Sequence, residues 1–425
     1  MKYALTLCLA LFALAGVHAQ DIYLQCGEIF DAESGKFLKE RTIVVSGNKI
    51  AGIQKGFVAG SAADRTMDLR SKTVLPGFMD MHVHIEGESS PSRYLERFTK
   101  NDVDRAFQST VYAKRTLLAG FTTVRDLGGS GVNIALGKAI DQGIVDGPRI
   151  FAAGKAIATT GGHADPTNGV RKELMHDPGP KEGVVNSPED ARKAVRQRYK
   201  NGAHVIKITA TGGVMSVAKN GQNPQFTMEE LKAIVDTAKD YGMLTAAHAH
   251  GDEGMRRAIL AGIKTIEHGT LMEEPTMDLM IENNTYLVPT ISAGKAAAAM
   301  AEIPNYLPEV VAKKAREIGP VSEKNFKRAY EKGVPIAFGT DAGVSPHGDN
   351  GKEFTYMHEA GMPVIAALQS AMTVPAKLLG VETELGLLKT GFLADIVAVD
   401  ENPVDNVRTL ESVSFVMKDG KVYKE

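Results

Sequence analysis

Tryptophan is absent from this 425-residue sequence, cysteine occurs only twice, and aromatic residues make up 6% of it. An excess of charge is also absent, because the formal net charge is −2. Neither nucleic acid nor an anionic membrane is therefore expected as a partner. Hydrophobic residues make up 43% of the sequence. That is enough for a large core, and a chain of this length is expected to form more than one compact unit.

The apolar stretch at the N-terminus, residues 4–15, is too short to cross a bilayer and has the features of an export signal. Cleavage is predicted between Ala19 and Gln20, which removes residues 1–19. Cys26 then remains the only cysteine, and an intramolecular disulfide is excluded. An exported protein without disulfides indicates the bacterial periplasm, with no membrane attachment after the signal is removed. The alternative is an uncleaved, buried N-terminal helix.

The two ends of the sequence alternate apolar and polar residues and contain the turn pairs Gly47-Asn48 and Asp419-Gly420. We predict that residues 20–76 and 381–425 form one small β-sandwich domain around a different central domain, residues 77–380.

The central domain alternates short apolar runs with amphipathic helical segments, which predicts an α/β fold of the (β/α)8 TIM-barrel type. A helix after Thr227 is one example, with Glu230 completing a capping box. An open doubly wound sheet is the alternative, but no G-x-G-x-x-G motif follows the first strand. The predicted strands are 77–84, 122–127, 149–153, 204–210, 244–248, 265–268, 286–289 and 335–341.

Polar side chains gather at the C-terminal ends of these strands, where barrel enzymes place their sites. Burial of so many polar groups is costly unless a metal satisfies them together. Four imidazoles and a carboxylate suit zinc, and they are too many for one ion that keeps an open position. Two ions fit if an anion bridges them. The predicted ligands are His82, His84, Lys207, His248, His268 and Asp341.

Lys207 can supply the bridging anion. Burial lowers the pKa of an amine, and the neutral amine can add carbon dioxide to give a carbamate, N6-carboxylysine, with two oxygens. The alternative for each residue alone is a hydrogen-bonded core histidine, a paired lysine or a capping aspartate.

Several phrases resemble the binuclear metal-dependent amidohydrolase superfamily. Within it, the sequence is most similar to the prolidase-like Xaa-Pro dipeptidases and Xaa-Arg/Lys carboxypeptidases, a group that includes ochratoxin-hydrolysing amidohydrolases. The phrases are "HVH", "GFTTVRDLGG", "TTGGHADP", "IKITATGGVMS", "AAHAHG", "TIEHGT", "GTDAGVSPHGDN" and "GFLADIVAVDENP".

The resemblance implies a role for each ligand. One Zn²⁺ would be held by His82, His84 and Asp341, and the second by His248 and His268, with carboxylated Lys207 between them. Asp341 would also accept the proton of the attacking hydroxide and return it to the leaving amine.

Three further residues are candidates for binding substrate. The resemblance gives His163 and His250 to the substrate carbonyl and the terminal carboxylate, with His163 counted among the catalytic residues. Arg125 could clamp a carboxylate, and a structural ion pair is equally consistent with its position. Glu86 and Glu88 follow the first strand, and their charges leave room for basic substrates.

The reaction class is hydrolysis of the amide bond before a C-terminal residue, in dipeptides or N-acyl amino acids. The loop after the seventh strand contains Lys295 and no acid. We therefore expect neutral or apolar C-terminal residues such as Phe, Leu or Pro, and N-acyl-phenylalanines of the ochratoxin A type.

Four alternatives stay open: an Xaa-Arg/Lys carboxypeptidase, a cyclic amide hydrolase, a mononuclear deaminase, and a non-catalytic periplasmic binding protein. The resemblance also implies a homo-oligomer, with an octamer as one candidate.

Overall fold

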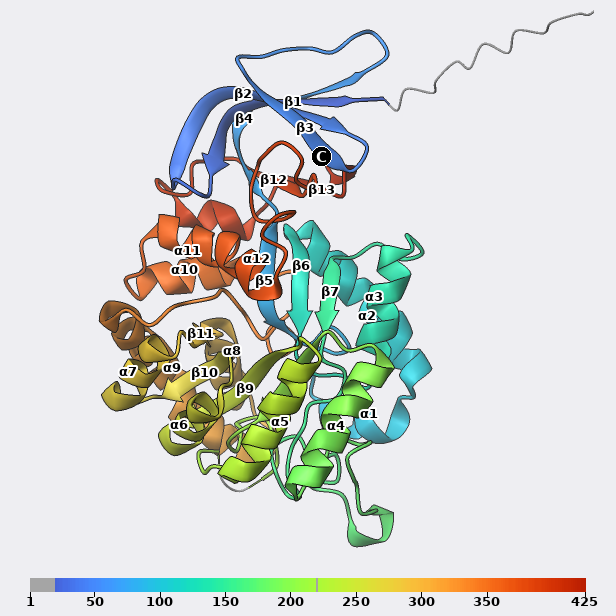
Figure 1. Ribbon diagram of the computed structural model, residues 1–425, viewed down its shortest axis with the longest axis vertical. Coiled ribbons are helices and arrows are strands. Elements are labelled where there is room, and N and C mark those ends of the chain that lie inside the picture. The colour runs from blue at the N-terminus through green and yellow to red at the C-terminus, as the bar shows by residue number, and fades with distance from the viewer. Residues whose placement is uncertain (1–19, 219–220) are drawn as a thin grey trace, which may run out of the picture.

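The computed structural model describes residues 20–218 and 221–425, so the predicted export signal lies outside the described residues. A small sheet stands on one end of a larger α/β unit (Figure 1). Strands from both ends of the chain form this sheet in the order β14-β13-β12-β4-β1-β2-β3. They are β1 (Ile22–Asp31), β2 (Lys36–Ser46), β3 (Lys49–Lys55), β4 (Arg65–Pro76), β12 (Ile396–Val399), β13 (Phe415–Lys418) and β14 (Lys421–Lys424).

The two ends of the chain join where β4 pairs in parallel with β1 and antiparallel with β12. One face of the sheet buries a separate apolar cluster that contains Leu24, Ile43, Val74, Ile396 and Phe415. Met67 and Leu69 of β4 are buried between exposed neighbours, as the period of two in a half-buried strand requires, and the last four residues of β4 are all buried.

The larger unit is built on parallel strands in two groups, β5-β6-β7 and β8-β9-β10-β11. β5, β6 and β8 are buried at every position, as expected for strands covered on both faces. Their bounds are β5 (Phe78–Val83), β6 (Phe121–Asp126), β7 (Arg149–Ala152), β8 (Val205–Thr209), β9 (Leu244–Gly251), β10 (Thr265–Leu271) and β11 (Tyr286–Val288).

Backbone hydrogen bonds connect the two groups on both sides and close the barrel. On one side Ile157 bridges to Ile208. On the other, an extended segment lies between β11 and β5, where Ile336 bridges to Leu287 and the Met81 N–H donates to the Phe338 carbonyl.

The prediction of a regular strand over residues 335–341 was wrong, because the structure has an extended segment there. At Thr340 the backbone N–H donates to the Asp80 carboxylate and not to a neighbouring strand, and the Thr340 hydroxyl donates to the same carboxylate. Asp341 then has a left-handed backbone with φ 56°.

Helices pack around the outside of the barrel (Figure 1). The predicted capping box of Thr227 and Glu230 is confirmed at the start of α5. No helix in the described part of the chain is long and apolar enough to cross a bilayer. The helices are α1 (Arg93–Thr99), α2 (Asp102–Leu118), α3 (Val132–Asp141), α4 (Pro188–Asn201), α5 (Met228–Asp240), α6 (Asp252–Ala261), α7 (Glu274–Glu282), α8 (Ile291–Ala301), α9 (Glu309–Lys332), α10 (Lys352–Glu359), α11 (Val364–Ser370) and α12 (Thr373–Leu379), with 3-10 turns η1 (Lys172–Leu174) and η2 (Val407–Glu411).

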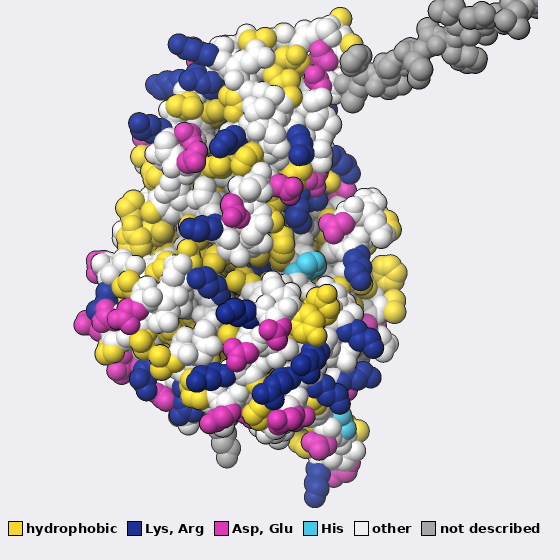
Figure 2. Space-filling view, viewed as in Figure 1, with side chains coloured by type: hydrophobic (Ala, Val, Ile, Leu, Met, Phe, Trp, Pro, Cys, Tyr) yellow, Lys and Arg dark blue, Asp and Glu magenta, His cyan; other side chains and the backbone are white. Residues whose placement is uncertain are grey.

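Charged side chains of both signs are interspersed over the face shown in Figure 2, and no large area of that face carries a single sign.

Candidate metal centre

The six predicted ligand residues converge on one cavity at the C-terminal ends of the barrel strands. His82, His268 and Asp341 each place one ligand atom so that the three atoms lie within 4.8 Å of one another. The His84 Nε2 atom lies 3.3 Å from the Asp341 Oδ1 atom. These residues come from β5, the turn after β5, β10 and the extended segment that closes the barrel.

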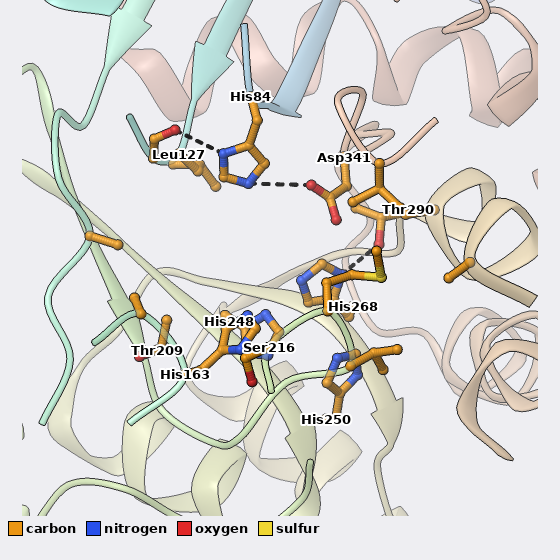
Figure 3. A pocket seen from close by; sticks show the side chains of 18 of the residues that line it. His84, Leu127, His163, Thr209, Ser216, His248, His250, His268, Thr290 and Asp341 are labelled. Atoms are coloured by element: carbon orange, nitrogen blue, oxygen red, sulfur yellow. Dashed lines mark hydrogen bonds and ion pairs between the residues drawn. The ribbon is translucent and has the colours of Figure 1, made fainter. Parts of the chain in front are cut away.

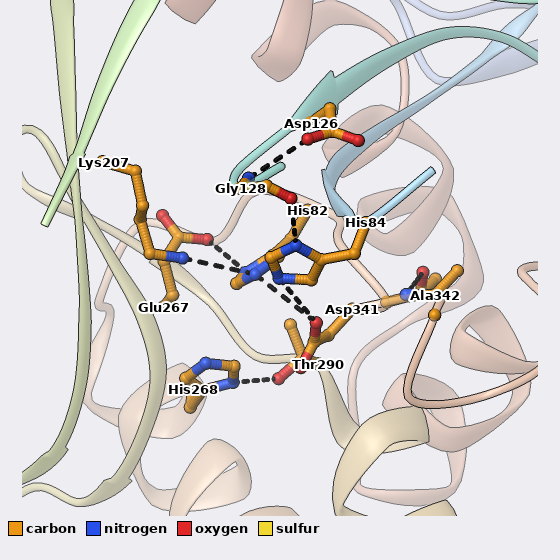
Figure 4. Close-up of polar contacts among 12 residues, drawn as sticks. His82, His84, Asp126, Gly128, Lys207, Glu267, His268, Thr290, Asp341 and Ala342 are labelled. Carbon is orange, nitrogen blue, oxygen red and sulfur yellow. Dashed lines mark hydrogen bonds and ion pairs between the residues drawn. The ribbon is translucent and has the colours of Figure 1, made fainter. Parts of the chain in front are cut away.

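The outer nitrogen of three histidines faces a hydrogen-bond acceptor (Figure 4). His82 Nδ1 lies 2.9 Å from the Glu267 carboxylate, and His84 Nδ1 lies 2.9 Å from the Gly128 carbonyl. His268 Nδ1 lies 2.7 Å from the Thr290 hydroxyl. Because the outer nitrogens of His82 and His84 must donate their protons to these oxygens, their Nε2 lone pairs face Asp341, which is the arrangement that metal ligands need.

Lys207 on β8 reaches the same point, with its Nζ atom 3.4 Å from the His82 Nε2 atom. Burial lowers the pKa of this amine, and it raises the pKa of the Asp341 carboxyl. The Asp341 Oδ1 atom is buried and has no hydrogen-bond partner within the described residues. An unsatisfied buried carboxylate oxygen beside neutral imidazoles fits a divalent cation.

His248, His163 and His250 form the second half of the cavity wall (Figure 3). The His163 ring stacks on the His248 ring with centroids 4.3 Å apart, and His248 lies 4.6 Å from His268. His248 differs from the other ligand residues because its Nε2 atom faces the Gly212 carbonyl at 3.1 Å, which leaves Nδ1 as its ligand atom.

The histidines in the cavity are neutral imidazoles. Burial lowers the pKa of His84 and of His163 to about 3 and the pKa of His250 to about 4. The pKa values of the other three, His82, His248 and His268, also lie well below the ordinary value, again mainly because of burial. Neutral imidazole is the form that binds a metal.

The structure places Arg125 in a buried ion pair with Glu267, which is the second of the two roles that the sequence left open for it. The Arg125 side chain is completely buried beneath the site and does not line the cavity. The guanidinium donates to the Met81 carbonyl at 2.7 Å, to the Thr265 hydroxyl at 3.0 Å and to the Glu267 carboxylate at 2.9 Å. The other Glu267 oxygen holds His82, so Arg125 acts through Glu267 on a candidate ligand.

Glu86 is buried and does not lie at the cavity mouth. Its carboxylate accepts backbone N–H groups of Ser130, Gly131 and Asn133 at the start of α3, where the helix favours negative charge. Gly129 is required beside it, because a Cβ atom there would lie 2.2 Å from the Glu86 carboxylate oxygen.

Glu88 and His347 hold the rim of the barrel together outside the cavity. The Glu88 carboxylate accepts the His347 backbone N–H at 2.8 Å. The His347 ring places Nε2 2.9 Å from the Gly87 carbonyl and stacks on Tyr112. His347 therefore stabilises the loop structure at this rim.

The cavity has a volume of about 470 Å³, which suits a small organic ligand. One wall is apolar and comes from the loop after β8, from α8 and α9, and from the loop after Asp341. The cations Arg93, Arg97 and Lys155 also line the cavity. The apolar wall contains Val214, Ala293, Ala297, Ala315, Ile318 and Val344.

The profile of the amidohydrolase family matches residues 73–424. The chain belongs to the amidohydrolase family. It is also 31% identical to the ochratoxinase of Aspergillus niger over 417 residues, which cover 92% of this chain and 84% of the ochratoxinase.

Solved amidohydrolase structures share the fold along almost the whole chain. A Xaa-Pro dipeptidase with methionine in its active site has a TM-score of 0.93 and 52% identity, and the match covers 96% of this chain and all of the other. A prolidase in complex with N-methylphosphonate-L-proline has a TM-score of 0.87 and 32% identity, with the same coverage. The predicted fold class and the resemblance to this group are confirmed.

Three functional features of this amidohydrolase escaped the sequence reading. Glu267 precedes a candidate ligand, and a buried acid in a strand is a signal for a buried partner. Gly213 gives room to the His163 ring, since a Cβ atom there would lie 2.2 Å from it. Arg93 enters the cavity from a loop and short helix that carry no periodic signal.

Proposed function

We propose that this amidohydrolase uses two divalent metals, most consistently Zn²⁺, to cleave the amide bond before a C-terminal amino acid. The single observation that carries the proposal is the convergence of the six candidate ligands on one cavity. His82, His84 and Asp341 would hold one ion, and His248 and His268 the other. Lys207, as N6-carboxylysine, would lie between them.

The bound ions would activate water as the nucleophile and polarise the amide carbonyl. Asp341 would be the proton carrier of this site, because its carboxylate lies among the candidate ligands and lines the cavity in which the attacking water and the leaving amine would meet. His163 and His250 face the cavity with neutral rings, so each can donate a hydrogen bond to a substrate oxygen.

The apolar wall supports a neutral side chain on the substrate. Asp165 and Glu182 also line the cavity, but the Asp165 carboxylate accepts N–H groups of Gly161 and Thr167 and the Thr167 hydroxyl. The Glu182 carboxylate accepts the Gly179 N–H. Three cations, Arg93, Arg97 and Lys155, line the same cavity as these two acids, which argues against an Xaa-Arg/Lys carboxypeptidase.

Two relatives support the same class of substrate. One is a Xaa-Pro dipeptidase with methionine in its active site, and another is an ochratoxinase. Dipeptides ending in Pro, Leu, Met or Phe and N-acyl-phenylalanines are therefore the substrates to test first.

Arg93 takes the role that Arg125 cannot have, recognition of the substrate's terminal carboxylate. The leaving amine must lie beside Asp341 to receive its proton, and the carboxylate of an α-amino acid is two bonds from that nitrogen. Arg93 donates to the Ser89 hydroxyl at 3.0 Å and lies 3.5 Å from the carbonyl of Gly343, two residues beyond Asp341. Among the described residues, no carboxylate lies within ion-pair distance of its guanidinium.

The decisive experiment is a panel of dipeptides and N-acyl amino acids assayed with the zinc-loaded protein, together with the metal content per chain. We expect turnover of substrates with neutral C-terminal residues and two ions per chain. Efficient cleavage only before Lys or Arg would favour the carboxypeptidase, and one ion per chain the deaminase. Turnover of cyclic amides alone would favour the cyclic amide hydrolase, and binding of dipeptides without turnover would indicate a binding protein.

The role of Arg93 is tested with a dipeptide and its C-terminal amide. In the wild type the amide should be cleaved about 10- to 100-fold less efficiently, because one charge-assisted contact is lost. Arg93→Gln should cleave both equally slowly. Arg97→Gln is the matched control and should keep the preference, since Arg97 donates to the Asn168 and Pro166 carbonyls instead.

A further inference from the structure

Helices α1 and α2 lie at the outer edge of the barrel (Figure 1), and they expose an unusual number of large apolar side chains. Five such residues between positions 95 and 111 are 50% to 73% exposed. No other stretch of similar length in the described part of the chain exposes more than two. We call these residues the α1–α2 face; they are Leu95, Phe98, Val103, Phe107 and Val111.

The residues on α2 form a continuous stripe. Val103, Phe107 and Val111 are spaced four apart, so they lie above one another on one side of the helix. The opposite side of α2 buries Ala113 and Leu117 against the barrel. One apolar side of this helix therefore packs within the chain, and the other has no partner in it, which is typical of a protein interaction site.

The size of this face matches one half of a protein dimer interface. The five side chains expose on the order of 500 Å² of apolar surface at these exposed fractions. A standard interface buries about 800 Å² on each partner, of which somewhat more than half is apolar.

The charged residues beside the stripe would be complementary between two copies of the chain, because acidic residues lie at one end of α2 and basic residues at the other. Asp102 and Asp104 lie in the first turn of α2, and Lys114 and Arg115 lie near its end, each half-exposed and 3.8 Å from a carboxylate of its own chain. If two copies cross antiparallel at Phe107, each acidic end lies beside the basic end of its partner, and the helix dipoles oppose one another favourably.

We propose that the α1–α2 face is an isologous interface with a second copy of this chain, with the two-fold axis close to Phe107. Val103 of one copy then packs against Val111 of the other. The self-complementary charge pattern favours a second copy over an unrelated protein.

The interface also reaches the cavity, because α1 is one of its walls. Tyr94 and Arg97 line the cavity, and the Tyr94 hydroxyl donates to the Met215 carbonyl at 2.9 Å. A helix of seven residues is too short to be stable by itself. Contact of Leu95 and Phe98 with a second copy would therefore fix this wall. This last consequence rests on the proposed function, whereas the interface does not.

The first test is the mass of the full chain in solution, measured by light scattering and sedimentation over a range of concentrations. Phe107→Glu should halve the assembled mass and weaken association about 100-fold, because two buried charges would meet at the axis. Leu260→Glu, an equally apolar exposed position on α6, should leave the mass unchanged. KM of the Phe107→Glu enzyme should rise while its metal content stays constant.

The second test does not depend on how Phe107→Glu folds. Cys26 is buried, so in a Cys8→Ser background Phe107→Cys adds the only accessible thiol of the described chain. A residue on the two-fold axis meets its own copy, and mild oxidation should give a disulfide-linked dimer. Leu260→Cys should not cross-link.

A wild-type chain that is monomeric at all concentrations would overturn the proposal. An assembly that Phe107→Glu leaves intact, or one in which Phe107→Cys fails to cross-link, would place the interface elsewhere and also overturn it. Loss of dipeptide turnover in the panel above would leave the mass and cross-linking results untouched, so the two proposals fail separately.

Discussion

Removal of one member of the buried Arg125–Glu267 pair should lower the free energy of unfolding and leave the recognition of substrate unchanged. Both side chains are completely buried, and the guanidinium donates three hydrogen bonds within 3.0 Å. Arg125→Met would leave the Glu267 carboxylate with the Thr265 hydroxyl and His82 as its remaining partners. Removing one partner of such a pair costs about 3–5 kcal/mol of unfolding free energy.

The pair is best measured as a double-mutant cycle in urea, on the metal-free chain. Glu267→Gln should cost a similar amount, because it leaves the buried guanidinium with neutral acceptors only. The double variant Arg125→Met/Glu267→Gln should cost much less than the two single changes together, since neither charge is then left alone. Arg192→Met breaks an exposed pair with Glu189 and should cost less than about 1 kcal/mol.

Two further measurements, metal affinity and the ratio of dipeptide to dipeptide-amide cleavage, distinguish the role of Glu267 from that of Arg125. Glu267→Gln should weaken metal binding about 10- to 100-fold, because it changes the group that orients His82. Arg125→Met should leave the ratio of dipeptide to dipeptide-amide cleavage unchanged. A loss of that ratio at full stability would refute the structural role and restore Arg125 as the carboxylate clamp.

Three other results are expected. Lys207→Ala should lose bound metal and activity, and acetate should restore part of both, which metal analysis and a dipeptide assay would show. Removal of metal by a chelator should lower the unfolding free energy by about 3 kcal/mol relative to protein at 100-fold saturation, measured by urea unfolding. Burial, and repulsion from Glu86, raise the pKa of Asp126 from 3.8 to about 7. The folded chain thus holds a proton that the unfolded chain releases, and the stability from this group is lost as pH rises from about 4 to 7, by about 4 kcal/mol at most. Asp126→Asn should remove that slope from urea midpoints measured across this range, and an unchanged slope would contradict the assignment.

Much of the candidate site could be predicted because barrel strands deliver their chemistry at one end. His82, Lys207, His248 and His268 each follow an apolar run, and the parallel order of the strands brings such positions together. The interior of the barrel was harder to predict. Arg125 and Glu267 are 142 positions apart, and only the closed barrel shows that the two residues neutralise one another.

The loops could not be predicted for a different reason. Loop side chains accept hydrogen bonds from backbone N–H groups, and the positions of these groups follow no periodic pattern in the sequence. Glu86 looks like an acid at the cavity mouth in the sequence, but its carboxylate accepts backbone N–H groups. The carboxylate of Asp165, which lines the cavity, also accepts backbone N–H groups. The sequence shows the acidic residues but not which backbone N–H groups contact them. The surroundings of each carboxylate could therefore be described only from the structure.

Several residues with strained backbone conformations lie in the same cavity as the buried Asp341 oxygen that has no hydrogen-bond partner. His268, Thr290 and Asp341 are three of the seven non-glycine residues with positive φ in the described chain, and all three line the cavity. Each such residue costs about 1–2 kcal/mol unless its surroundings fix it. The Thr290 hydroxyl contacts the His268 ring, so these two strained residues hold one another, and the Asp341 N–H donates to the His82 carbonyl at 2.7 Å. This centre contains strained residues and a buried carboxylate oxygen without a partner. A bound cation should therefore stabilise it more than any other part of the fold. Stability and metal loading of this amidohydrolase should therefore change together in every variant that touches these three positions.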